Sequence, residues 1–131
     1  MSMNKFIALT AFALTTTLSF AQKVGDENEV MSKSKGEYTI NTASLCKTVG
    51  FKSTTPLLIT IKKDKITKIE ALPNKETPKF FDRVKNSMLP KYVGLNIKEH
   101  KKVDGISGAT RSSNAVKANV AEAYNYYKEN K

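Results

Sequence analysis

The sequence predicts a small α+β domain in which helices pack against an antiparallel sheet. Two alternating apolar runs near the middle of the chain, separated by a short polar turn, are typical of a β-hairpin. Two segments with apolar residues at helical spacing follow, one beginning near Thr77 and one over 113–128. The order of strands, helix, loop and helix therefore fits a small domain with helices packed against an antiparallel sheet.

The first residues predict an export signal. Lys5 supplies a positive charge, residues 6–20 are uncharged and mostly apolar or threonine, and Ser19 and Ala21 are small residues of the type that a signal peptidase reads. The apolar part is shorter than the roughly 20 residues of a membrane span. We predict a cleaved signal peptide over 1–21 and an exported protein, periplasmic or secreted, without a stable membrane span. The alternatives are an uncleaved anchor and a buried helix.

The rest of the chain is long enough for one domain, since domains usually take roughly 100–200 residues. Residues 22–36 are polar and have no apolar period, so we predict a flexible tether there and a folded domain over 37–131. Cys46 is the only cysteine, which excludes an internal disulfide and favours a small buried side chain.

The chain is strongly basic, with 22 Lys and Arg against 12 Asp and Glu. Nucleic acid, an anionic membrane and a solvated lysine-rich surface are the alternatives. The export signal argues against nucleic acid, and the lysines are spread along the chain. We therefore expect a solvated surface, with a weak preference for acidic redox partners.

The strands are predicted from alternation. Leu57, Ile59 and Ile61 share one face of a strand over 57–62, and a second strand over 66–72 has mixed faces. Residues 63–65 form the turn between them. A further short strand is expected over 37–42.

The first helix is predicted to begin at Glu76 or Thr77, with Pro78 in the first turn, where proline is tolerated. Its apolar stripe at helical spacing consists of Phe80, Phe81, Val84 and Met88. Residues 91–102 are basic and predicted to be irregular, with room for one short strand, and His100 is expected to be a solvated loop residue.

The last helix is predicted over 113–128, with Ser112, Ser113 or Asn114 as its N-cap. Val116, Val120 and Tyr124 recur at helical spacing and are expected to face the sheet.

The segment just before this helix points to a ligand site. Small residues surround the hydroxyl of Thr110, so a bulky group has access to it, and Gly108 and Ala109 let the backbone approach closely. A phosphate at this position would meet free N–H groups and the positive end of the helix dipole. Ser112 and Ser113 add hydroxyl donors, and Arg111 adds charge.

These residues resemble a known motif. Asp104, Ser107, Gly108, Ala109, Thr110 and Ser112 together resemble the flavinylation motif of the FMN-binding domain family. The resemblance implies that a flavin transferase joins the phosphate of FMN to Thr110 as a phosphoester. It also implies that Asp104 helps the transferase to recognise its substrate.

A second block supports the resemblance. Gly50-Phe51, the hairpin ending at residues 66–69, and Lys75-Glu76-Thr77-Pro78 look like the upstream part of the same family, so that the match covers residues 38–127. The resemblance places Glu76 and Thr77 near the flavin. Many members continue with glycines after the proline, whereas this chain has Lys79-Phe80-Phe81, which predicts a differently shaped ring pocket.

The resemblance implies an exported electron-transfer flavoprotein with covalent FMN, similar to flavin subunits of sodium-translocating NADH:quinone reductases. Its redox donor and acceptor are not identified by the sequence, and an electron carrier is favoured over a stand-alone enzyme, with no catalytic or metal-ligating residue assigned. Two alternatives stay open: a flavin-free or noncovalent exported binding module, and an accessory subunit of a separate reductase.

Overall fold

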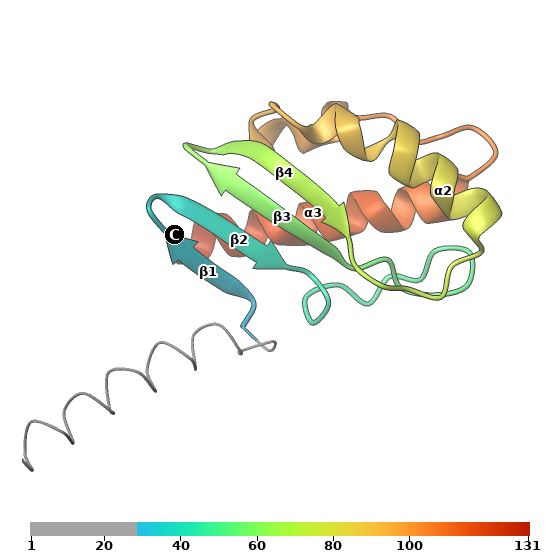
Figure 1. The fold of residues 1–131 in the computed structure, drawn as a ribbon, viewed down its shortest axis with the longest axis horizontal. Coiled ribbons are helices and arrows are strands. Elements are labelled where there is room, and N and C mark those ends of the chain that lie inside the picture. The colour runs from blue at the N-terminus through green and yellow to red at the C-terminus, as the bar shows by residue number, and fades with distance from the viewer. Residues whose placement is uncertain (1–28) are drawn as a thin grey trace, which may run out of the picture.

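Four antiparallel strands form one sheet in the computed structural model, which describes residues 29–131 (Figure 1). The sheet order follows the chain, and the strands are β1 (Met31–Ser34), β2 (Glu37–Asn41), β3 (Leu57–Lys62) and β4 (Lys65–Ala71). Helices pack against this sheet, so the predicted α+β class is confirmed. Within the described residues, no helix is both long and apolar enough to cross a membrane.

The predicted hairpin is β3 and β4. Its turn is tighter than expected, because Lys63 and Asp64 both have positive φ, 51° and 67°, and β4 begins at Lys65. Two left-handed residues are the signature of a turn whose twist matches the two strands. The register shifts between Thr60 and Ile61, which explains why β4 shows mixed faces in the sequence.

The tether predicted over 22–36 is wrong for its last part. Residues 31–34 form β1, which pairs with β2 through a turn at Lys35 and Gly36. Three of the four residues of β1 are exposed, because it is an edge strand, and its sequence therefore lacks an apolar period. The predicted signal peptide over 1–21 and the rest of the tether, up to residue 28, lie outside the described residues.

The helical elements are α2 (Pro78–Ser87), the short 3₁₀ helices η1 (Leu89–Tyr92) and η2 (Ile97–Lys102), and α3 (Thr110–Asn130). The start of α2 at Pro78 agrees with the prediction. The segment 91–102 is more regular than expected: it contains η2 and the end of η1, and only one isolated bridge, from Asn96 to Lys65, takes the place of a strand.

The last helix begins three residues earlier than predicted. The N–H of Ser113 already donates to the carbonyl of Ala109 at 2.9 Å, which is a helical hydrogen bond. Ser112 and Ser113 are therefore inside the first turn, and both are buried. Their hydroxyls bond to other segments rather than capping the helix, which is why the serine signal misplaced its start.

The core lies between the sheet and α3, which runs along the sheet in Figure 1. Val116 and Val120 are fully buried there, as predicted. Tyr127 also reaches the sheet, and its ring meets that of Tyr38 edge-on at 5.2 Å. Tyr124 lies half-buried at the margin of this face, with its ring 5.6 Å from that of His100.

His100 is not the solvated residue that the sequence suggested. It is only 8% exposed, because η2 folds back against α3. Burial lowers the pKa of its imidazole, and neighbouring Lys101 lowers it further. Cys46 is buried, in agreement with the expectation of a small core side chain.

A buried polar network joins α3 to the sheet. Thr42 Oγ1 donates to Asn119 Oδ1 at 2.5 Å and accepts from the N–H of Leu57 at 2.9 Å. The amide nitrogen of Asn119 donates to Ala115 O at 2.8 Å and to Thr55 Oγ1 at 3.3 Å. Because these bonds satisfy the buried Asn119 side chain, they fix the position of α3 along the sheet.

Candidate functional site

The N-terminus of α3 has no side-chain cap. Ala109 is its N-cap and has no side chain that could accept a hydrogen bond from the first turn. The N–H groups of the first helical residues, Thr110, Arg111 and Ser112, have no carbonyl partner within the helix. A helix start of this kind presents partial positive charge to an anion.

The loop before α3 is fixed from two sides. Arg83 of α2 donates to the carbonyl of Ser107 at 2.7 Å, and Ser113 Oγ accepts from the N–H of Ile106 at 2.9 Å. Gly108 has φ +84°, and a Cβ there would lie 3.0 Å from the Arg83 guanidinium. Only glycine adopts this conformation easily, so the backbone requires a glycine at position 108, two residues before Thr110.

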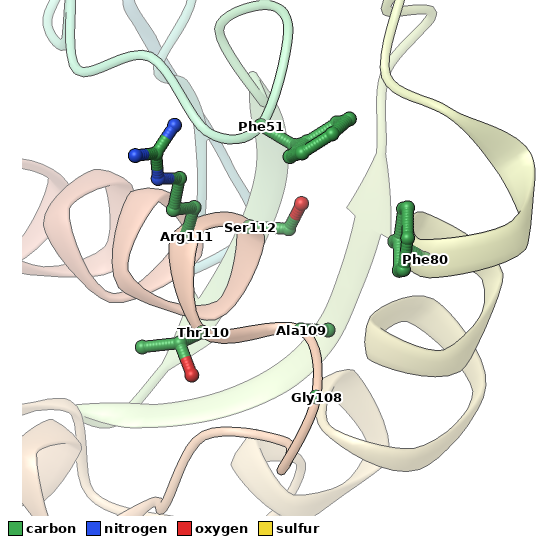
Figure 2. Close-up of a pocket in the computed structure, with 7 residues that line it drawn as sticks. All are labelled: Phe51, Phe80, Gly108, Ala109, Thr110, Arg111 and Ser112. Carbon is green, nitrogen blue, oxygen red and sulfur yellow. The ribbon is translucent and has the colours of Figure 1, made fainter.

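A cavity of about 350 Å³ lies beside this helix start (Figure 2). Its volume is within the usual range of roughly 300–1,000 Å³ for small-molecule sites. Residues from three separate segments line it: Phe51, Phe80, Gly108, Ala109, Thr110, Arg111 and Ser112.

Two aromatic rings form the apolar wall of the cavity. The centroids of Phe51, from the loop before β3, and Phe80, from α2, are 5.1 Å apart, with an angle of 52° between the rings. Phe51 is 47% exposed, so an apolar ring stands open to solvent at the cavity mouth. In Figure 2, Thr110 and Arg111 extend from the helix start, while Ser112 points toward the side of Phe51.

Glu76 lies behind the cavity wall and is only 6% exposed. Its Oε1 accepts from the N–H of Phe51 at 2.9 Å and from the hydroxyl of Ser112 at 2.6 Å. Its Oε2 accepts from the N–H groups of Lys52 and Ser53, at 2.5 and 2.8 Å. A carboxylate has about four lone-pair sites, and all four are used.

These contacts keep Glu76 ionised. Burial by itself would raise the pKa of its carboxyl. The hydrogen bonds from Ser112 and from the amides of Lys52, Phe51 and Ser53 outweigh burial and lower the pKa below its ordinary value of 4.5.

The structure brings most of the predicted site residues together. Gly108, Ala109, Thr110, Arg111 and Ser112 line the cavity, and Ser107 holds the loop through its carbonyl. The others lie around it.

Ser113 is turned inward, where its hydroxyl supports the loop. Thr77 is the N-cap of α2 and does not line the cavity. Asp104 is exposed on the segment that leads into the loop. Glu76 is expected to contact the ligand, but its carboxylate oxygens accept their four hydrogen bonds from protein groups.

The sequence does not predict that Phe51 and Phe80 form one wall of the cavity, or that Arg83 holds the loop before α3. In the sequence, Phe51 belongs only to a block that resembles the family. Phe80 belongs both to the apolar stripe of its helix and to the segment 79–81 that is expected to change the ring pocket. The adjacent pair Phe80 and Phe81 was the available signal, because only Phe81 is fully inside the core and Phe80 turns toward the cavity. Arg83 carried no signal, because its contact depends on tertiary structure.

The comparison with family models decides the assignment. The model of the FMN-binding domain matches residues 50–125, which contain the aromatic wall, Glu76 and the whole loop before α3. The chain belongs to the FMN-binding domain family. No curated protein and no solved structure matches it.

The residues present fit a flavin mononucleotide. The uncapped start of α3 and Arg111 suit a phosphate, since both offer positive charge and N–H donors. The exposed ring of Phe51 and the ring of Phe80 suit a flat aromatic system.

Proposed function

We propose that the protein is an exported electron-transfer flavoprotein that carries FMN on Thr110 through a phosphoester. One observation carries the proposal: an exposed threonine hydroxyl lies at the first position of an uncapped helix and lines a cavity with an aromatic wall. The family match supports FMN as the ligand.

The attachment is a phosphoryl transfer to the threonine. Thr110 Oγ1 attacks phosphorus of a flavin dinucleotide, forming the new P–O bond as the pyrophosphate bond breaks. The nucleoside monophosphate leaves with the electron pair, and the hydroxyl proton passes to a base of the transferase. A dinucleotide donor is required because a phosphoanhydride supplies the driving force that a simple monoester lacks. The free N–H groups at the start of α3 would hold the phosphate of the product and stabilise its charge.

The bound flavin supplies the electron transfer, and the protein supplies attachment, orientation and electrostatics. The attachment at Thr110 prevents loss of the cofactor outside the cell, where it could not be replaced easily. The exposed Phe51 leaves the cavity mouth open, so a donor and an acceptor protein can approach in turn.

Co-expression of the full chain with a flavin transferase tests the proposal. The purified wild type is expected to give a flavin-fluorescent band on a denaturing gel under ultraviolet light, and peptide mass mapping is expected to place the added mass on Thr110. Thr110→Ala should fold normally and give no fluorescent band. Thr48→Ala, an exposed threonine outside the loop, is the matched control and should remain labelled.

Absence of fluorescence on the wild type, with a transferase that labels another substrate, would contradict the covalent attachment. A yellow protein that loses its colour on denaturation would indicate noncovalent FMN.

A further inference from the structure

The loop that carries Phe51 is organised around a single carboxylate. It is a small turn closed by a bridge between Val49 and Thr54 and by a hydrogen bond from Gly50 N to Ser53 O of 2.8 Å. The three N–H groups within it, those of residues 51–53, all donate to Glu76. Consecutive amides that converge in this way form an anion-binding nest, here filled by the protein's own side chain.

Glu76 is itself held in place. Its N–H donates to Asn74 Oδ1 at 2.9 Å, and the N–H of Lys75 donates to Ser53 Oγ at 3.0 Å. The segment before α2 and the loop before β3 are therefore joined by bonds in both directions. Glu76 also accepts from Ser112, so the same carboxylate reaches the first turn of α3.

Gly50 lies where the Phe51 loop packs closely against Glu76 and the first turn of α3. A Cβ at residue 50 would lie 2.3 Å from Oε1 of Glu76 and 3.2 Å from the Cα of Ser112. Both distances are shorter than ordinary contacts, and the second is to backbone. The loop thus rests directly on the carboxylate and on the helix start, with no space for a side chain between them.

We propose that Glu76 is a positioning residue for the flavin cavity, holding the Phe51 loop against the start of α3 so that the Phe51 ring stays opposite Phe80. Phe51 is half-exposed, so packing alone does not fix its ring. A preformed wall reduces the entropy that binding would otherwise cost. This inference rests on the proposed function in taking FMN as the occupant of the cavity.

Amide hydrogen exchange of the full chain tests, without any flavin, whether Glu76 holds the Phe51 loop. In Glu76→Gln, an amide N–H₂ group replaces one acceptor oxygen, so we expect the amides of residues 51–53 to exchange at least about tenfold faster, in line with the loss of charge-assisted bonds. Asp82→Asn makes the same chemical change at an exposed position on α2 and should leave these amides unchanged. Equal protection in wild type and Glu76→Gln would overturn the proposal.

Visible circular dichroism of the flavin-loaded protein tests the positioning. A flavin held against ordered aromatic rings has an induced signal, which we expect to fall by half or more in Glu76→Gln while the flavin remains on Thr110. An unchanged signal in that variant would overturn the proposal, because the bonds from Glu76 to the Phe51 loop would then not shape the cavity. A wild type without flavin would instead contradict the proposed function, and the exchange experiment would still show whether Glu76 holds the loop.

Discussion

The hydroxyl of Ser112 donates a 2.6 Å hydrogen bond to Oε1 of Glu76, joining residues that are 36 positions apart. Through this bond, the carboxylate of Glu76 joins the first turn of α3 to the segment before α2. Thr110 is two residues before Ser112 on the same turn, so the bond also fixes the orientation of the candidate attachment site relative to the aromatic wall.

Gly50→Ala should destabilise the protein by about 1–3 kcal/mol, since the new Cβ would overlap Glu76 Oε1. Urea unfolding followed by circular dichroism measures this free energy. A double-mutant cycle checks whether overlap with Glu76 causes this loss of stability. In a Glu76→Ala background the overlapping oxygen is gone, so Gly50→Ala should lower the free energy of unfolding by clearly less. Equal costs in the two backgrounds would show that Gly50 is needed for another reason.

Asn119→Ala should destabilise by about 2–4 kcal/mol, because Thr42 and Thr55 would each lose a buried hydrogen-bond partner. Asn125→Ala is the control, since Asn125 is exposed on the same helix and alanine has the higher helix propensity. Thermal and urea unfolding should agree on this difference. A loss as small for Asn119 as for Asn125 would mean that the network contributes little.

Local patterns predicted the parts of the fold that depend on neighbouring residues. The alternation at 57–61 predicts β3, one of the two inner strands, and Pro78 marks the start of α2. The edge strand β1 was missed because an exposed edge needs no apolar period, and the start of α3 was misplaced because its serines bond to distant segments.

The candidate site also has a part that can be recognised in the sequence and a part that depends on tertiary contacts. The loop from Ser107 to Ser112 is continuous in the sequence, so its small residues and hydroxyls were recognisable there. The roles of Phe51, Phe80 and Glu76 depend on contacts between separate segments. No spacing rule predicts that a carboxylate will satisfy three amides some 25 residues before it in the chain.

The stability of the protein should fall in acid through Glu76. Its folded-state pKa is lower than its unfolded value of about 4.5, so the unfolded chain binds the proton more tightly. The stabilisation is therefore complete above about pH 4.5 and is lost as the pH falls through the folded-state pKa. Urea unfolding at several pH values between 7 and about 3 should show a steeper decline for wild type than for Glu76→Gln. Parallel curves would contradict this.

Asp104→Ala should slow the attachment of flavin while leaving the fold unchanged. Asp104 is exposed and precedes the loop that presents Thr110, which suits a residue read by a modifying enzyme. Since exposed substitutions of this kind usually change stability by no more than about 0.5 kcal/mol, slower labelling would report on recognition rather than unfolding. A time course of flavin fluorescence on denaturing gels, with limiting transferase, measures the rate. Asp82→Ala, at an exposed position on α2, should be labelled as fast as wild type, and an equal rate for Asp104→Ala would remove Asp104 from the recognition surface.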